Sequence, residues 1–141
     1  SRMRGLGPDD LLEVTESPMK GAAATQEFAE TTQLNKDMLK GRSMPIGQLS
    51  GSARDTAQRA ARTAKDPATK THLKNAGNSF HSASEAANKD LWGLVATSAV
   101  QAGSHAGKAA KSATKAVVKE QARSLQGAAR VITRRAKKRD K

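Results

Sequence analysis

The feature that most constrains the fold of this chain is a narrow apolar seam in its last third. Six apolar residues recur there at spacings of four and three, which is the repeat of one face of an α-helix. They are Val118, Ala122, Leu125, Ala129, Ile132 and Ala136. A helix with such a seam buries it against other helices, so the sequence predicts a helical bundle.

A row of cations follows a neighbouring line of the same predicted helix and is interrupted at Gly127. Its members are Lys111, Lys115, Lys119, Arg123, Arg130, Arg134 and Lys138. Residues 101–141 hold 12 Lys/Arg against 2 Asp/Glu, whereas residues 51–100 hold 7 against 4 and residues 1–50 hold 6 against 7. The basicity therefore belongs to the last third, where it favours an acidic partner such as nucleic acid, anionic lipid or an acidic protein.

The chain before the basic segment is predicted to be helical as well. Ser17-Pro18 and Asp66-Pro67 each pair an N-cap residue with a first-turn proline. We expect residues 91–99 to form a tight connection into the last of these helices, which either continues into the basic segment or bends at Gly103 and Gly107. The predicted helices span residues 17–41, about 50–65, 67–90 and about 99–116.

A faint internal repeat suggests two helix pairs. Residues 88–92 match residues 35–39 at a distance of 53 positions, and the Ala/Lys helix at 106–119 matches the Ala/Arg helix at 53–65. An alanine-rich chain also produces such matches by chance, so both explanations stay open.

No segment alternates in the manner of a β-strand, so the predicted fold class is all-α. We expect a four-helix bundle of two helix pairs with a long basic C-terminal helix. The predicted divisions are a flexible or short-helical arm at 1–16, an alanine-rich bundle at 17–107, and a basic helix and tail at 108–141.

Large side chains for a core are scarce. Phe28, Phe80 and Trp92 are the only aromatic residues, so the core must be built mainly from Ala, Leu, Val and Met. Both phenylalanines fall on predicted inner faces. Trp92, beside Gly93, is expected to plug a gap between helices, and a partner-binding anchor is the less favoured interpretation.

The residues offer little for catalysis. There is no cysteine, and His72, His81 and His105 are not spaced as an i, i+4 pair. No metalloprotease, nucleophile-elbow or phosphate-loop motif occurs. We therefore expect a protein that is not an enzyme and has no metal or cofactor. No apolar run reaches the ~18 residues that cross a bilayer, and no apolar signal region follows the first residues, so the expected location is cytoplasmic or within a virion or nucleoprotein.

The cations are the predicted binding site. A phosphate backbone would be held with strong salt dependence and little sequence reading, and the scarcity of aromatic residues argues against single-strand recognition. We expect Val118, Leu125 and Ile132 to dock the helix. The predicted contact residues for the acidic partner are Lys108, Lys111, Lys115, Lys119, Arg123, Arg130, Arg134, Arg135, Lys137 and Lys138.

Three stretches resemble a known family. They are Ser52-Ala53-Arg54 with the alanine spacing through Ala64-Lys65, Leu73 to Glu85, and Val117-Val118-Lys119-Glu120. Together, over about residues 50–138, they resemble talin-type rod bundles, above all the I/LWEQ actin-binding module, and vinculin and catenin bundles. The resemblance implies a cytoskeletal adaptor whose basic face contacts an acidic filament. The I/L-W-E-Q block itself does not occur here.

Three functions therefore remain open at this point. The first is a helical interaction module that binds an acidic protein or filament through the basic helix. The second is a nucleic-acid-associated or virion-internal structural protein that neutralises phosphates with the same helix. The third is a subunit of a larger assembly or oligomer, in which the alanine seams pair with other chains.

Overall fold

The computed structural model describes residues 31–36, 38 and 44–140. Within these residues every regular element is an α-helix, which confirms the all-α prediction. Residues 31–36 and 38 are helical, whereas the predicted arm at 1–16 and most of the predicted helix at 17–41 lie outside the described residues. The four long helices are α3 (Ile46–Thr63), α4 (Pro67–Asn88), α5 (Trp92–Ser112) and α6 (Ala116–Arg139).

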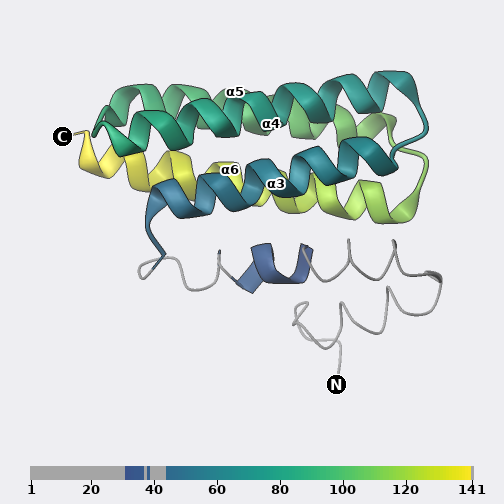
Figure 1. Cartoon of the computed structure of the whole chain (residues 1–141), viewed down its shortest axis with the longest axis horizontal. Coiled ribbons are helices and arrows are strands. Elements are labelled where there is room, and N and C mark those ends of the chain that lie inside the picture. Colours follow the sequence, from purple (N-terminus) through teal and green to yellow (C-terminus); the bar gives the residue numbers. More distant parts are fainter. Residues whose placement is uncertain (1–30, 37, 39–43, 141) are drawn as a thin grey trace.

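These four helices form an antiparallel bundle (Figure 1). Each helix packs against its neighbour in the chain, and α3 also packs against α6, so that the four close into a ring. The predicted four-helix bundle is therefore confirmed, but its membership differs from the prediction. The basic helix α6 is a full member of the bundle, because its apolar seam is buried against the other helices.

The core is built mostly from alanine. Phe80 is the largest fully buried side chain among the described residues, and Leu49, Leu73, Leu125 and Ile132 are buried with it. Most other core positions are alanines on α3, α4 and α5. Small side chains bury little area each, so the bundle depends on close approach of the helix backbones for its packing.

Trp92 packs at the edge of this core, half-buried at the start of α5. The guanidinium of Arg139 lies 4.7 Å from the centroid of its ring, a cation–π contact that joins the last turn of α6 to the first turn of α5. This position agrees with the expected packing role.

The start of α4 agrees with the prediction, whereas the starts of α3 and α5 differ from it. At α4, the Asp66 carboxylate accepts hydrogen bonds from Thr69 N at 3.3 Å and Thr69 Oγ1 at 2.9 Å, and Pro67 follows as the first helical residue. By contrast, α3 begins at Ile46, before the predicted start near residue 50, because Ile46 and Leu49 extend its buried face by one turn.

The expected connection at residues 91–99 is wrong. Only Lys89, Asp90 and Leu91 join α4 to α5, with Asp90 in the left-handed region at φ 57°. The following apolar residues are buried at helical spacing as part of α5, notably Val95, Ala96 and Ala99. Continuous hydrophobicity was misread as a turn here.

Gly103 and Gly107 do not bend the chain, since α5 runs through both. A Cβ at Gly103 would lie 3.1 Å from Ala129 Cβ, and one at Gly107 would lie 2.9 Å from Gln126 Nε2. The two glycines therefore permit α6 to approach α5 closely. The chain breaks later, at Ala113, whose backbone is extended (φ −65°, ψ 137°), so α5 does not continue into the basic helix.

The two helix pairs α3–α4 and α5–α6 repeat each other, but not at the 53 positions read from the sequence. The capping residues Ala64 (φ −64°, ψ 139°) and Ala113 (φ −65°, ψ 137°) end the first helix of each pair with the same backbone shape, 49 positions apart. In the same register, Ala53, Ala57 and Ala60 correspond to Ala102, Ala106 and Ala109, and all six are fully buried. The 53-position match fails because residues 35–36 are helical while residues 89–91 form a connection.

One Gly–Gln packing contact occurs in both pairs, with the two residue types on opposite helices. In the first, Gly77 of α4 faces Gln58 of α3, with 3.6 Å from a Cβ at Gly77 to Gln58 Cγ. In the second, Gly107 of α5 faces Gln126 of α6. Gln58 and Gly107 are 49 positions apart, as are Gly77 and Gln126. The same large-against-small contact thus occurs in both pairs with the two residues swapped.

The close α5–α6 approach yields a stability prediction. We expect Gly103→Leu to lower the free energy of unfolding by about 1–3 kcal/mol, because the new side chain must push Ala129 away. Gly51→Leu is the matched control, since a Cβ at Gly51 meets nothing within 4 Å. Chemical denaturation of both variants measures the difference. Equal stabilities of the two variants would contradict the packing role of Gly103.

Candidate functional site

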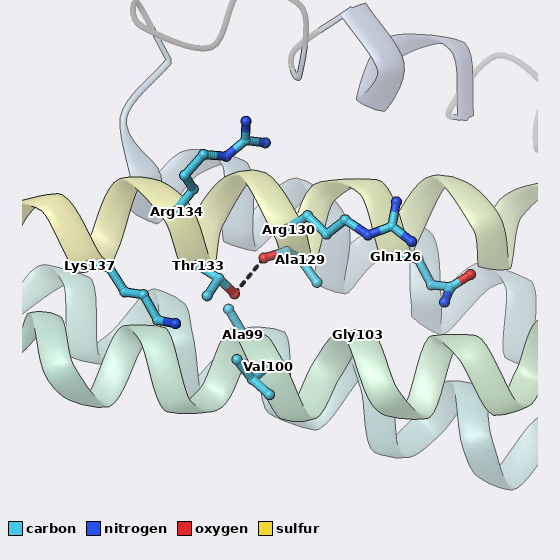
Figure 2. A pocket seen from close by; sticks show the side chains of 9 residues that line it. All are labelled: Ala99, Val100, Gly103, Gln126, Ala129, Arg130, Thr133, Arg134 and Lys137. Carbon is cyan, nitrogen blue, oxygen red and sulfur yellow. Dashed lines mark hydrogen bonds between the residues drawn. The ribbon is translucent and has the colours of Figure 1, made fainter.

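A cationic groove runs along the surface between α5 and α6. It consists of two adjoining hollows of about 630 and 440 Å³, both of which are lined by Gly103 and Gln126. We call the two together the α5·α6 groove. The larger hollow lies toward the Ala113–Lys115 connection, and the smaller lies toward the last turns of α6 (Figure 2).

Among the described residues, seven cations and no acidic side chain line this groove. Six of the seven are exposed and Lys119 is half-buried. Their span along α6, from Lys119 to Lys137, is about 27 Å at 1.5 Å per residue. The seven are Lys108 and Lys111 from α5, and Lys119, Arg123, Arg130, Arg134 and Lys137 from α6.

The floor of the groove is made of small residues. Ala99, Gly103 and Gly107 of α5 lie beside Ala129 of α6. Val100 is the larger apolar residue at its edge, and it is 54% exposed. A floor of this kind leaves room for a bulky extended ligand between the cations.

The cations of the smaller hollow point in different directions (Figure 2). Lys137 is directed toward α5, Arg130 lies along α6 toward Gln126, and Arg134 is directed away from α5. Between them, the Thr133 hydroxyl donates to the Ala129 carbonyl at 2.7 Å and is therefore engaged within its own helix. The three cations of this hollow all come from α6 and have no single point of convergence.

The predicted contact residues do not all lie in the groove. Seven of the ten line the groove, and two of these, Lys108 and Lys111, come from α5 instead of the basic helix. Lys115 is the N-cap residue of α6, and Lys138 is exposed outside the groove. The remaining one, Arg135, is directed elsewhere. Its Nη1 donates to the Met44 carbonyl at 2.7 Å, and burial, with Arg139 nearby, lowers its pKa.

The three residues expected to dock the helix have a clear position. Val118, Leu125 and Ile132 are 0–1% exposed and belong to the core of the bundle. They therefore hold α6 in place below the groove and are not part of the exposed surface.

The small residues of the floor were missed as site residues. The sequence allowed either a continuous helix or a bend at Gly103 and Gly107, whose i, i+4 spacing places both on one face of a helix. That spacing is a signal for close approach of a second helix at this face.

No favourable interaction with the α6 dipole explains the cations at the start of that helix. The first turn of α6 contains no acidic residue, and Lys115 and Lys119 lie at the end of the helix where the backbone dipole is positive. Cations at a helix N-terminus are disfavoured by the dipole, whereas anions are favoured there. The beginning of α6 is thus suited to receive negative charge from outside the helix.

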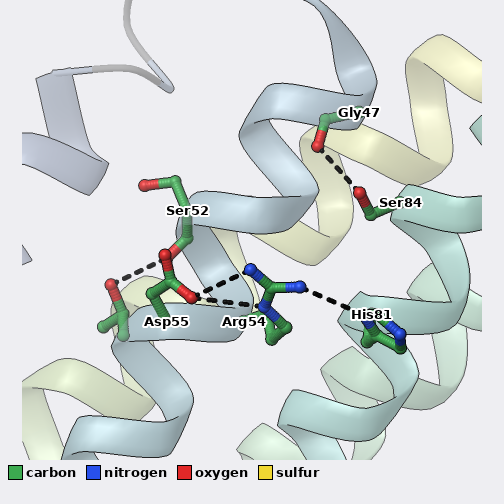
Figure 3. A network of polar contacts seen from close by, with 7 residues as sticks. Gly47, Ser52, Arg54, Asp55, His81 and Ser84 are labelled. Carbon is green, nitrogen blue, oxygen red and sulfur yellow. Dashed lines mark hydrogen bonds and ion pairs between the residues drawn. The ribbon is translucent and has the colours of Figure 1, made fainter. Parts of the chain in front are cut away.

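On the opposite flank, between α3 and α4, polar side chains pair with one another at the end away from the Ala64–Asp66 connection (Figure 3). Arg54 lies 3.1 Å from the Asp55 carboxylate and 3.0 Å from His81 Nδ1, and His81 lies 3.4 Å from Glu85. The Ser84 hydroxyl donates to the Gly47 carbonyl at 3.2 Å. Acidic partners within the chain thus accompany cations on this part of the surface, in contrast to the α5·α6 groove.

Glu120 is the acidic residue within the basic helix. Burial raises its pKa above the ordinary value near 4.5, and Arg123 offsets part of that rise. Because the raised pKa means that folding disfavours the ionised form, the carboxylate costs stability at neutral pH. The cost fades as the pH falls through the folded-state pKa and is absent below the unfolded-state pKa.

We therefore expect Glu120→Gln to raise the melting temperature at pH 7 and to leave it unchanged near pH 3. Thermal melts of both proteins at the two pH values measure this. Glu85→Gln, which removes a carboxylate that is 62% exposed, is the control and should change the melting temperature little. A Glu120→Gln melting temperature below that of the parent at pH 7 would show that the carboxylate stabilises α6.

Within the described residues, no helix is long and apolar enough to span a membrane, and no group of three or more His, Asp or Glu side chains is placed to hold a metal ion. Comparisons with protein families, with curated proteins and with solved structures find no match to this chain.

Proposed function

We propose that this protein is a non-enzymatic helical module that binds an extended acidic partner in the α5·α6 groove. The observation that supports this most is the lining of the groove, seven cations without an acidic residue among the described residues. Ordinary surfaces mix both signs, so a one-signed groove about 27 Å long favours a ligand that carries repeated negative charge.

A phosphate backbone fits this lining better than an acidic protein filament does. Protein–protein interfaces take much of their energy from large apolar or aromatic anchors in a desolvated centre. The groove offers Val100 at its edge and otherwise small or polar residues. Over about 27 Å, one strand of duplex DNA presents about eight phosphates, which is close to the number of cations available.

A duplex is favoured over a single strand. Single-strand binding relies on aromatic side chains on which bases stack, and none of the described residues that line the groove is aromatic. The proposed contacts are to phosphates, so binding should depend strongly on salt and little on sequence. The second candidate, the actin-type adaptor, rests on the resemblance to talin-type bundles alone, and it becomes an outcome of the test below.

The test is to neutralise part of the groove and titrate duplex DNA. We expect Arg123→Gln, Arg130→Gln and Arg134→Gln together to weaken binding at least tenfold at low salt. The slope of log K against log salt concentration should become shallower by about three, roughly one for each lost phosphate contact. Fluorescence anisotropy of a labelled duplex at several salt concentrations measures both quantities.

A control variant removes three cations outside the groove, Lys36→Gln, Lys89→Gln and Lys138→Gln. All three are exposed, and this variant has the same net charge as the groove variant. If both variants lose affinity and salt dependence equally, binding follows net charge and the groove has no special part. Saturable co-sedimentation with actin filaments at physiological salt, without DNA binding, would replace the phosphate proposal with the filament proposal.

A further inference from the structure

The first helix pair carries a second set of cations in the positions of the groove cations. Each of the four cations of the larger hollow has another Lys or Arg 49 positions earlier in the chain. Lys108, Lys111, Lys119 and Arg123 correspond in this way to Arg59, Arg62, Lys70 and Lys74. Of seven cations between residues 51 and 100, four therefore fall on the repeat.

The exposure of the two sets also corresponds. Lys70 and Lys119 are both half-buried in the first turns of α4 and α6, whereas Lys74 and Arg123 are both exposed one turn later. Arg62 and Lys111 lie in the last turns of α3 and α5 and are exposed. Arg59 is half-buried where Lys108 is exposed. The two sets thus share sequence position in all four pairs and access to solvent in three of them.

Lys119 is not explained by the stability of its own helix. It lies in the first turns of α6, whose first turn has no acidic residue and whose N-cap residue is Lys115, so the positive end of the helix dipole opposes it. Lys70 lies at the matching place in α4, where the Asp66 carboxylate caps the helix. Lys70 donates to the Ala61 carbonyl at 3.2 Å, which satisfies one of its three donors. Among the described residues, Asp66 is engaged as the α4 N-cap and Asp55 by Arg54.

The two sets lie at the same end of the bundle, on opposite flanks. The Ala64–Asp66 and Ala113–Lys115 connections border one small hollow and are side by side (Figure 1). Because the helices form a closed ring in chain order, the outer surfaces of α3–α4 and α5–α6 face opposite directions. Two helix diameters separate them, about 20 Å.

We propose that the α3–α4 flank is a second phosphate-binding surface, so that one molecule holds two separate nucleic-acid duplexes, one against each flank. This rests on the proposed function of the α5·α6 groove. The second surface is the shorter one, because the remaining groove cations have no basic counterparts. Arg130, Arg134 and Lys137 correspond to His81, Glu85 and Asn88. The second surface should therefore bind more weakly, and at low salt.

The test is stoichiometry. Native mass spectrometry and calorimetric titration with a duplex of about 12 base pairs should give two duplexes per chain at low salt. Arg62→Gln, Lys70→Gln and Lys74→Gln together should reduce this to one duplex, with the tighter site unchanged within about twofold. Lys111→Gln, Lys119→Gln and Arg123→Gln should instead weaken the tighter site at least tenfold.

Bridging gives a second readout. Energy transfer between two duplexes labelled with donor and acceptor should appear with the parent protein and be lost in both triple variants. It should persist in the control Lys36→Gln, Lys89→Gln, Lys138→Gln. Circular dichroism melts of all variants confirm folding before the titrations, and any triple variant that unfolds is replaced by its three single variants.

The outcomes separate the two proposals. A single duplex per chain, with affinity unaffected by the α3–α4 substitutions, would overturn the second surface and leave the groove standing. Two duplexes per chain that persist in the α3–α4 variant would place the second contact elsewhere and also overturn it. No DNA binding by the parent protein at low salt would overturn both.

Discussion

The close approach of alanine- and glycine-lined helix surfaces is the constraint on which the rest of this structure depends. Phe80 is the largest fully buried side chain among the described residues, and most of the other buried apolar positions are alanines. The bundle gains its packing from backbones that come near each other, and Gly103 and Gly107 set that distance between α5 and α6. The same glycines form the floor of the groove, so the packing of the bundle also creates its cationic groove.

The repeat connects this packing to the charge distribution. Two helix pairs with the same extended connection bury alanines at equivalent positions and exchange one Gln–Gly contact. They are not independent units, since α4 also packs against α5 and α3 against α6. Within that common arrangement, basic residues occur at the same four places near the connections. The two pairs differ toward the other end: on α3–α4, Arg54 pairs with Asp55 and His81 with Glu85, whereas no acidic residue among the described residues lines the smaller hollow of the α5·α6 groove.

Much of the fold followed from local sequence signals, and the site followed only in part. Helical spacing and the Asp66-Pro67 start identified the bundle and one of its turns correctly. The start of α5 was missed because a run such as Leu94-Val95-Ala96 has no polar interruption that would distinguish a helix from a connection. The groove needed the structure, because Lys108 of α5 and Arg123 of α6 line the same hollow and no spacing along one helix can place them together.

The position of the cations is more informative than their number. Cations in last turns, as Arg62 and Lys111 are, agree with the helix dipoles. Lys119 lies at the opposite end of its helix, where the first turn has no acidic residue and the N-cap residue Lys115 makes no side-chain cap hydrogen bond. At the matching place in α4, the Asp66 carboxylate caps the helix and Lys70 donates to the Ala61 carbonyl at the end of α3. The start of α6 is therefore the place where an anion would be attracted by a lysine and by a helix terminus together.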